Sequence, residues 1–422
     1  MKILFLADNF PPERNAQASR VYERACYWQR WGHGVTVITC FPNFPDGKLH
    51  PGCKSKIREV SLLDAIRVVR ILTFIAPNAG KLLRILDFLS YMLSAIAMGT
   101  LEAKPDLVVA TSPQFFAAVA GWVLSVVHCV PFVMEVSDLW PDSIVAVGAM
   151  KRSFFLRCLE RVELFLYARA KRIVVLTGSF KRDLVARGVS SDKIDVVING
   201  VDLARYAPRE PDCGFAARLG IFPGDFVVGY LGTLGMAHGL QNVLRAAALT
   251  KNPRIRFLLI GPGAEREQLA AKAAEWSVRN VVIAPPQAKE NMPAAWSICH
   301  VALVHLKDSP LFKTVIPSKI FEAMGMGLPI LLATPKGEAS AIVETENCGV
   351  SIAAGDPGAL ASAAEGLAGN PSELKRMAER SHSAAPKYSR ERQAREMILS
   401  LERAIGSEDA VSALKARESV TN

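Results

Sequence analysis

Short apolar runs alternate with helix-like stretches along the whole chain, and this alternation constrains the fold more than any other feature. The first half contains KILFLAD, GVTVITC, DLVVAT, PFVMEV and RIVVLT, and the second half restarts with FVVGYLG, RFLLIGPG, NVVIAP, HVALVHL and PILLA. Such alternation is typical of parallel sheets whose two faces are covered by helices. Because 422 residues exceed one ordinary core, we expect an α/β protein with two doubly wound domains.

Ligands of such sheets bind outside the carboxyl ends of the strands. The loops at those ends are therefore the candidate binding segments: Asn9–Ala16, Ser137–Asp142, Gly232–Gly239, Gly261–Gly263, Pro285–Gln287 and Lys307–Lys319.

The segment PSKIFEAMGMGLP, residues 317–329, carries the strongest chemical signal. Pro317 and Ser318 suit the start of a helix, and Gly325 and Gly327 suit its end. A helix start aims N–H groups at an anion, and Lys319 adds a cation there. Glu322, one turn on, suits the vicinal hydroxyls of a ribose. The alternative is a capped helix with an ordinary surface Lys–Glu pair.

Three segments carry a resemblance to a known family. PSKIFEAMGMGLPI, the linker-like NGVDLARYAP from Asn199 and FVMEVSDLWPDS from Phe132 resemble motifs of family 4 of the retaining glycosyltransferases. The resemblance spans roughly residues 1–400 and extends to bacterial surface-polysaccharide enzymes (O-antigen, capsule, colanic acid), including N-acetylfucosaminyl-type transferases. It implies the GT-B fold, two Rossmann-like domains facing across a cleft. In that family the Glu at the position of Glu322 holds the donor ribose.

The resemblance also implies donor-binding residues in both halves. They are Asn15, Ala16, Gly232, Thr233, His238, Gly261, Gly263, Gln287, Lys313, Thr314, Val315, Ile316 and Ser318. The pattern departs from the family at three of its positions. Thr233 and His238 stand where an Arg and a Lys usually clamp the diphosphate, and Thr314 replaces the first Glu of a pair. We expect Lys313 and Lys319 to supply the missing cations. His238 has an ordinary alternative as an exposed residue at a helix start.

A fourth departure lies in the first half, where Ser137 replaces the usual His of a His-Asp pair and Asp138 remains. Asp138 follows a strand, and we expect it to act in catalysis as a carboxylate, alongside Lys319 and Glu322. The alternative is that Asp138 only stabilises a turn. Glu135, inside the strand, is either the alternative catalytic carboxylate or a buried ion-pair partner for a Lys or Arg. Arg14 and Arg20 bracket the N-terminal loop, and we expect them at an acceptor phosphate or as solvated surface groups.

The expected domains are 1–198, binding the acceptor, and 199–385, binding the nucleotide sugar. The resemblance implies that a C-terminal helix, 386–406, crosses back to the first domain. SRERQAREMILSLERAI from Ser389 has the apolar stripe of such an amphipathic helix. The polar tail, 407–422, is expected to be disordered.

Charge is uneven along the chain. Residues 1–198 hold 25 Lys and Arg against 17 Asp and Glu, which leaves +8 of the total +10 in the first half. The apolar stretch Lys81–Leu101 and the amphipathic Lys151–Arg172, with seven basic residues, look like interfacial helices or core helices. The run Leu107–Met134 lacks Asp, Glu, Lys and Arg, but prolines and a glycine divide it into strand, helix and strand. These features indicate a lipid-linked acceptor and a peripheral membrane partner.

No metal motif is apparent, since the chain has no HExxH, no Cys–His cluster and no convincing DxD. A helix dipole with Lys can stabilise a departing diphosphate, so we expect a metal-independent enzyme without a cofactor. The eight scattered cysteines and the short apolar start, MKILFLAD, predict free thiols and no secretory signal. We therefore expect a cytoplasmic protein on the inner face of the plasma membrane.

Three functions remain as alternatives. The first is a retaining glycosyltransferase that moves a sugar, an N-acetylated amino sugar among the candidates, from UDP to an undecaprenyl-diphosphate-linked acceptor. The second is a sugar-nucleotide epimerase of the same fold. The third, a basic nucleic-acid-binding protein, is disfavoured because the basic residues are dispersed and no stacking-aromatic or helix-turn-helix pattern occurs.

Overall fold

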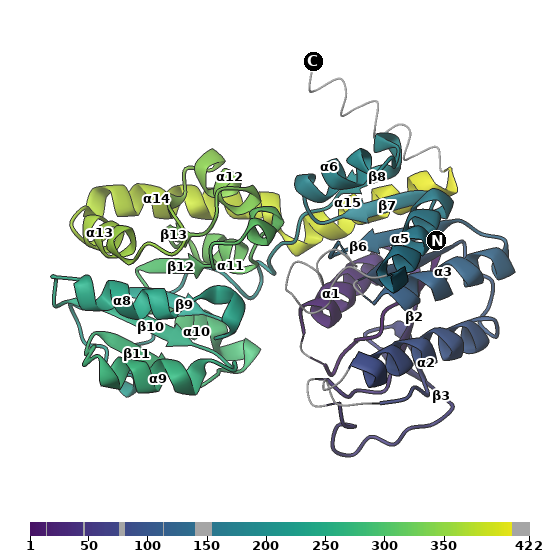
Figure 1. The fold of residues 1–422 in the computed structure, drawn as a ribbon, viewed down its shortest axis with the longest axis horizontal. Helices are drawn as coiled ribbons and strands as arrows, with labels where there is room; N and C mark the ends of the chain where they lie inside the picture. The colour runs from purple at the N-terminus through teal and green to yellow at the C-terminus, as the bar shows by residue number, and fades with distance from the viewer. Residues whose placement is uncertain (14, 45–46, 76–80, 113, 140–153, 407–422) are drawn as a thin grey trace. The chain divides into compact units, whose positions relative to one another are not determined.

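The computed structural model describes residues 1–422 except 14, 45–46, 76–80, 113, 140–153 and 407–422 (Figure 1). The chain divides into two compact units. Unit 1 contains Met1–Ile198 and the segment from Gln393 onward, and unit 2 contains Asn199–Arg392. The division after residue 198 coincides with the boundary expected from the linker-like segment. Arg14 and the expected disordered tail lie outside the described residues.

Unit 1 is built on an eight-stranded sheet with the order β3-β4-β2-β1-β5-β6-β7-β8. Neighbouring strands are parallel except β3 and β4, which pair antiparallel at one edge. Strand β1 lies inside the sheet, with Ile3 opposite both Val35 of β2 and Leu107 of β5. The strands are β1 (Lys2–Leu6), β2 (Gly34–Cys40), β3 (Arg58–Leu63), β4 (Ile66–Ile71), β5 (Leu107–Ser112), β6 (Phe132–Val136), β7 (Arg172–Val175) and β8 (Ile194–Val196).

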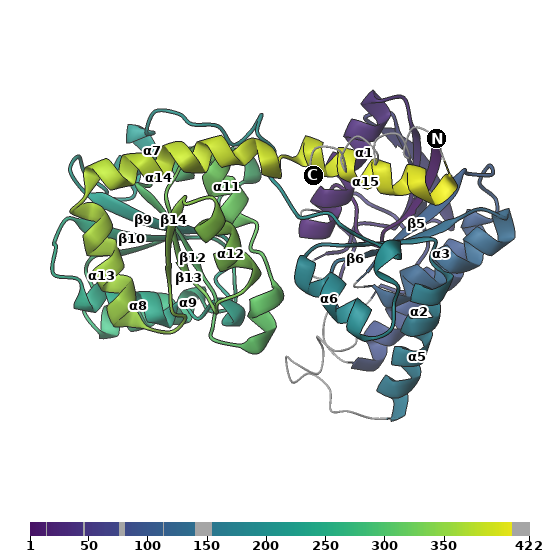
Figure 2. The same cartoon turned by 90° about the horizontal axis from the view of Figure 1, so that it is seen from above.

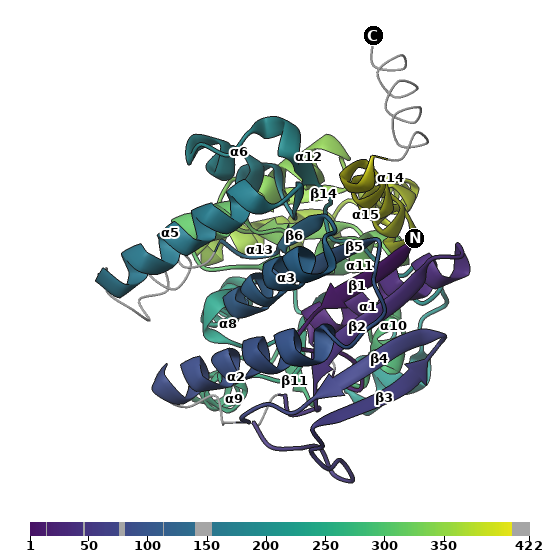
Figure 3. The same cartoon turned by 90° about the vertical axis from the view of Figure 1, so that its right-hand side faces the viewer.

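Helices cover both faces of this sheet (Figures 2 and 3). One face packs against α1 (Ala16–Arg30) and α15 (Arg390–Ile405), whose buried side chains form one core with β1 and β2. Trp28 of α1 donates its indole N–H to the carbonyl oxygen of Ala394 in α15 at 2.9 Å. The other face packs against α2 (Lys81–Gly99), α3 (Phe115–His128), α5 (Phe154–Arg169) and α6 (Gly178–Ala186).

Unit 2 has a six-stranded parallel sheet with the order β11-β10-β9-β12-β13-β14. Helices α8, α9 and α13 share a buried cluster on one face, and α10 and α11 contact strands β9 and β12. The strands are β9 (Phe226–Leu231), β10 (Ile255–Ile260), β11 (Val281–Ala284), β12 (Val301–His305), β13 (Ile330–Ala333) and β14 (Gly349–Ile352). The helices are α7 (Cys213–Arg218), α8 (Gln241–Leu249), α9 (Arg266–Glu275), α10 (Met292–Ser297), α11 (Lys319–Met326), α12 (Glu338–Thr345), α13 (Pro357–Ala368) and α14 (Pro371–Ala384).

Short 3-10 turns precede several of these elements: η1 (Ser191–Lys193), η2 (Met236–His238), η3 (Lys289–Asn291), η4 (Pro310–Thr314) and η5 (Ala385–Tyr388). In both sheets the strand order reverses beside the first strand of the unit. The reversal falls between β1 and β5 in unit 1, and between β9 and β12 in unit 2. Ligands of doubly wound sheets bind at such reversals.

The two apolar segments of unit 1 each have one buried and one exposed face. In α2, Tyr91 and Ala95 are buried, whereas Leu83, Leu86 and Leu93 are 42, 45 and 63% exposed. In α5, Leu166 is buried and Phe165 is 37% exposed. Among the described residues no helix combines the length and apolarity needed to cross a bilayer. The run Leu107–Met134 forms β5, α3 and part of β6, as the sequence predicts, although its turn residue 113 is not described.

Candidate functional site

Helix α11 places the strongest sequence motif at the reversal point of unit 2. It begins at Lys319, after the loop that follows β12, and ends where Gly327 adopts the left-handed conformation with φ 68°. Ser318 and Gly327 lie at its two ends as expected, but Gly325 does not. Ser318 is the N-cap residue, but its side chain makes no capping hydrogen bond. Gly325 lies inside the helix, where an added Cβ would come within 2.8 Å of the carbonyl oxygen of Tyr206.

Lys319 lies against the glycine loop that follows β9. Its ammonium nitrogen is 4.7 Å from the centroid of the Tyr230 ring, a cation–π distance. A Cβ added at Gly232, whose φ is 143°, would lie 2.5 Å from Cε of Lys319. The positive φ favours glycine here, and a larger residue would displace the end of the lysine side chain. Burial lowers the pKa of Lys319 to about 8, against the opposing charge of Glu322.

The two glycine loops of unit 2 pack directly on each other. A Cβ at Gly261 would lie 2.0 Å from the carbonyl oxygen of Gly232, and one at Gly263 would lie 2.2 Å from that of Leu234. The amide of Leu234 donates to the carbonyl oxygen of Pro262 at 2.7 Å. Gly261 and Gly263 thus have a structural role, because they allow their backbone to pack against the backbone of Gly232 and Leu234.

His238 belongs to the same loop and is neutral near pH 7. Burial, followed by the charge of Lys319, lowers the pKa of His238 to about 4. Its carbonyl oxygen bonds to Nδ1 of His305 at 2.6 Å, and Nε2 of His305 bonds to Asn242 at 3.1 Å. Nδ1 of His238 is buried without a hydrogen-bond partner among the described residues. His238 therefore cannot serve as the missing cation, although a neutral ring N–H can still donate to a phosphate oxygen.

Glu322 is held beside Lys319 by an indole. Trp296, at the end of α10, donates its Nε1–H to Oε2 of Glu322 at 3.2 Å. Burial raises the pKa of Glu322, while the Trp296 hydrogen bond and the charge of Lys319 act in the opposite direction. The carboxylate retains acceptor capacity for a further donor, because one indole N–H uses a single lone pair.

The loop before α11 supplies the remaining expected donor residues. The hydroxyl of Thr314 donates to the carbonyl oxygen of Leu311 at 3.0 Å, within its own turn. Lys313 is exposed, Val315 is partly buried and Ile316 is buried. Gln287, after β11, donates to the carbonyl oxygen of Pro285 at 3.2 Å. Thr233 is exposed, and its carbonyl oxygen accepts from the Tyr230 hydroxyl at 2.8 Å.

In unit 1, the loop after β1 is organised by side-chain amides. Asn15 caps α1, because its Oδ1 accepts from the amide of Ala18 at 2.8 Å, and its Nδ2 donates to Oδ1 of Asn9 at 2.7 Å. Gln17 donates to Oδ1 of Asp8 at 2.8 Å, and burial raises the pKa of Asp8. Ala16, the first residue of α1, is exposed. A small, exposed residue at a helix start remains compatible with an approaching ligand.

Arg20 and Glu135 form a buried ion pair with Arg24. Nε of Arg20 and Nη1 of Arg24 lie 3.2 and 2.5 Å from Oε1 of Glu135. Burial alone would raise the pKa of Glu135, but the charges of Arg24 and Arg20 lower it to about 2. Glu135 is therefore the buried partner that the sequence left open. Arg20 is 4% exposed, so it is not a solvated surface group.

Asp138 is the remaining candidate carboxylate in unit 1. It follows β6 by two residues, is partly buried, and its carbonyl oxygen accepts from the hydroxyl of Ser112 at 3.4 Å. Ser137, at the position of the usual His, donates its hydroxyl to the carbonyl oxygen of Ser112. Both residues therefore anchor the chain at the carboxyl ends of β5 and β6. Residues 140–142 of this loop are not described.

Four residues of the unit 2 site were missed by the sequence reasoning: Tyr230, Trp296, Asn242 and His305. Tyr230 could have been found, because it stands two residues before Gly232 at the end of a strand. Trp296 and Asn242 carry no local signal, since their partners lie far along the chain. Within the described part of the chain, no group of three or more His, Cys, Asp or Glu side chains could hold a metal. All eight cysteines are free.

Comparison with known families identifies the class of protein. Residues 15–200 match the glycosyl transferase 4-like domain, and residues 225–370 match the glycosyl transferases group 1 domain. The first match covers most of unit 1, and the second lies within unit 2. The chain therefore belongs to the glycosyltransferases that combine these two domains.

Two curated relatives are bacterial proteins. The chain is 31% identical over 237 residues to the probable glycosyltransferase WbjE of Pseudomonas aeruginosa, a match that covers 54% of this chain and 58% of the relative. It is 23% identical over 343 residues to the putative colanic acid biosynthesis glycosyl transferase WcaI of Escherichia coli (strain K12), covering 78% and 82%. The chain thus spans little more than half the length of the first relative.

Solved structures share the fold. The crystal structure of Anabaena Alr3699/HepE in complex with UDP superimposes with a TM-score of 0.71 at 18% identity, covering 96% of this chain and all of the other. Sucrose-phosphate synthase from Thermosynechococcus elongatus gives 0.75 at 16% identity, covering 96% and 99%. The expected GT-B fold, with a doubly wound α/β domain in each unit, is confirmed.

Proposed function

We propose that this glycosyltransferase moves a sugar from a UDP-sugar, with an N-acetylated amino sugar among the candidates, to an undecaprenyl-diphosphate-linked acceptor. The observation that carries the proposal is the pairing of Lys319 and Glu322 at the start of α11, beside the glycine loops. A cation near helix N–H groups suits a diphosphate, and a carboxylate one turn away suits ribose hydroxyls. The HepE structures, described as complexes with UDP and UDP-glucose, support the choice of nucleotide.

Surface polysaccharide assembly is the proposed setting, supported by the description of WcaI as a colanic acid biosynthesis enzyme. We propose transfer with retention. The bond between the sugar C1 and the phosphate oxygen breaks, and the acceptor oxygen bonds to C1 on the same face. The acceptor proton passes to the departing phosphate, so the products are UDP and a glycoside. Lys319 would stabilise the charge that grows on the phosphate, and Asp138 would orient the acceptor hydroxyl.

Product analysis tests this function. The protein is incubated with a panel of UDP- and GDP-sugars and a lipid-diphosphate sugar, and product masses are read. The proposal expects one sugar added to the lipid and an unchanged configuration at C1 by NMR. A converted UDP-sugar formed without any acceptor would favour the epimerase instead, and an inverted C1 would exclude retention.

We propose that transfer needs no metal ion. Lys319 and the N–H groups at the start of α11 supply positive charge at the place where a metal would otherwise act. Activity is expected to stay within about twofold of the untreated enzyme when EDTA is added. Loss of activity that Mg²⁺ or Mn²⁺ restores would contradict this proposal.

Peripheral attachment to the inner face of the plasma membrane is also proposed, through the exposed side of α2. Leu86 and Leu93 are 45 and 63% exposed and lie two turns apart on that helix. Each buried leucine contributes about 1.5–3 kcal/mol, and this contribution resists salt. Replacing both leucines by aspartate should therefore reduce co-sedimentation with anionic vesicles at high salt by at least tenfold.

The matched control for this prediction is Leu249→Asp, because Leu249 is 55% exposed in unit 2. This variant should sediment with vesicles as the unchanged protein does. Equal sedimentation of the α2 variant and the Leu249 variant would mean that α2 does not enter the bilayer surface.

A further inference from the structure

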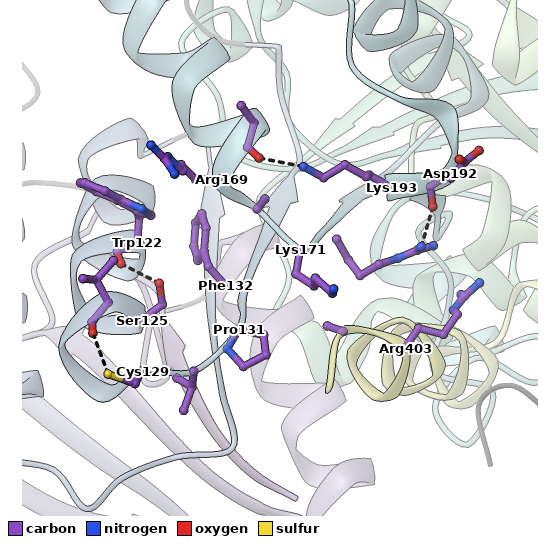
Figure 4. Close-up of a pocket in the computed structure, with 16 residues that line it drawn as sticks. Trp122, Ser125, Cys129, Pro131, Phe132, Arg169, Lys171, Asp192, Lys193 and Arg403 are labelled. Carbon is purple, nitrogen blue, oxygen red and sulfur yellow. Dashed lines mark hydrogen bonds between the residues drawn. The ribbon is translucent and has the colours of Figure 1, made fainter. Parts of the chain in front are cut away.

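A basic cavity lies in unit 1 where strands β6 and β7 begin, at the opposite end of the sheet from Asp138. Its volume is about 910 Å³, and it opens beside the amino ends of β6 and β7 and the carboxyl ends of α3 and α5 (Figure 4). Asp138 and the loop after β1 follow the carboxyl ends of strands, so this cavity is separate from them. A volume of this size is within the range of small-molecule sites.

Five cations line the cavity: Arg169, Lys171, Arg172, Lys193 and Arg403. Asp192 is the lining carboxylate among the described residues. In Figure 4, Lys171 lies between the Pro131–Phe132 segment and Arg403. The lining therefore has a clear excess of positive charge.

Three of the cations already have partners. Arg172 donates from Nη2 to Oδ1 of Asp195 at 2.7 Å, and Arg403 pairs with the same carboxylate at 3.0 Å. Lys193 donates to the carbonyl oxygens of Tyr167 and Ala168 at 3.1 and 2.9 Å. Lys193 thereby caps the last turn of α5, the usual role of a cation at a helix carboxyl end.

The remaining two cations, Arg169 and Lys171, take no part in these pairings. Arg169 stacks over the ring of Phe165 at 5.1 Å, and neither side chain has an acidic partner among the described residues. The charge of Lys171 also adds to burial in lowering the pKa of Lys193. Like charges held close together are destabilising, and a bound anion would relieve the repulsion between Lys171 and Lys193.

We propose that this cavity binds a phosphate ester anion. Arginine and lysine together are the usual ligands of phosphate, arginine through its planar fork and lysine as a point charge. Part of the lining is apolar, with Trp122, Pro131 and Phe132, which suits the carbon skeleton of an ester better than a bare ion. Val126 and Val127 on α3 are 58 and 52% exposed beside the cavity, so a phospholipid headgroup is one source of the phosphate, and a soluble ester is the other.

The test compares two variants of the full chain that change charge equally. Lys171→Glu alters the cavity, and Lys104→Glu alters an exposed residue between α2 and β5 on the same unit. Each protein is titrated with glycerol phosphate in a calorimeter and sedimented with phosphatidylglycerol and with phosphatidylcholine vesicles. We expect Lys171→Glu to weaken binding in at least one arm by about tenfold more than Lys104→Glu.

The two arms separate the sources of the phosphate. Loss of glycerol phosphate binding supports a site that accepts a soluble ester, and loss restricted to phosphatidylglycerol vesicles supports a headgroup site. Arg169→Glu should reproduce whichever loss Lys171→Glu shows. Equal behaviour of Lys171→Glu and Lys104→Glu in both arms would overturn the proposal, because diffuse surface attraction would then account for all binding. Neither arm measures sugar transfer, so the outcome is independent of the proposed function.

Discussion

Replacing Glu322 by alanine is expected to weaken UDP binding by about 10- to 150-fold. The carboxylate lies one turn inside α11 and is oriented by the indole of Trp296 at 3.2 Å. A hydrogen bond to a charged group contributes about 1.5–3 kcal/mol, and 1.4 kcal/mol corresponds to a factor of ten. Calorimetric titration with UDP measures the change directly.

Two further variants make this prediction specific. Glu344→Ala removes an exposed carboxylate on α12 and should bind UDP as the unchanged enzyme does. Trp296→Phe keeps the carboxylate but removes its N–H partner, so a smaller loss of about 0.5–1.5 kcal/mol is expected. Equal UDP affinities for Glu322→Ala and Glu344→Ala would show that Glu322 does not hold the ribose.

Replacing Lys319 by alanine is expected to lower kcat by about 100- to 1,000-fold with a much smaller change in KM. Its ammonium group lies over Tyr230 and against Gly232, at the start of α11. Charge develops on the leaving diphosphate during transfer, so a cation there stabilises the transition state more than the bound substrate. Steady-state kinetics separates the two effects, with the exposed Lys375→Ala as control. A change confined to KM would contradict this assignment.

The lowered pKa of Lys319 gives this prediction a pH dependence. The side chain is cationic below about pH 8 in the folded protein, whereas its ordinary pKa is 10.5. Donor kcat/KM should therefore fall as the pH rises through 8, and this fall should be absent from the alanine variant. Between pH 8 and 10.5 the unfolded chain binds more protons than the folded protein, so the lysine's contribution to stability rises with pH. Any stability gained at pH 7 by Lys319→Met should consequently shrink over that interval.

Most of the fold follows from local pattern, and the omissions have identifiable causes. Strands β3, β4, β8 and β14 were missing from the sequence interpretation. The β3–β4 hairpin turns through Asp64 and Ala65, with φ values of 49° and 65°. A turn of this type usually contains Asn or Gly, so an Asp-Ala pair does not predict a hairpin. Strands β8 and β14, with three and four residues, are too short to show a period.

The candidate site was predictable where chemistry and position lie in one segment. Lys319 and Glu322 belong to a single helix start, and the glycine loops follow strands directly. The orientation of each side chain was not predictable, because it depends on residues distant in the chain. Trp296 lies 26 residues before Glu322, and Arg24 lies 111 residues before Glu135. The burial of Arg20 likewise depends on its ion pair with Glu135, and a sequence pattern cannot show that these two residues are neighbours.

Helix α15 belongs to the core of unit 1 but is synthesised after unit 2, so the order of synthesis affects when unit 1 can complete its fold. Trp28 bonds to Ala394, 366 residues later, and the core on that face includes Met397 and Leu401. During synthesis, unit 2 emerges completely before these residues do. Domains usually fold as they emerge, N-terminal first. In this chain the face of α1 and β1 that α15 covers therefore stays uncovered until unit 2 and α15 have been translated.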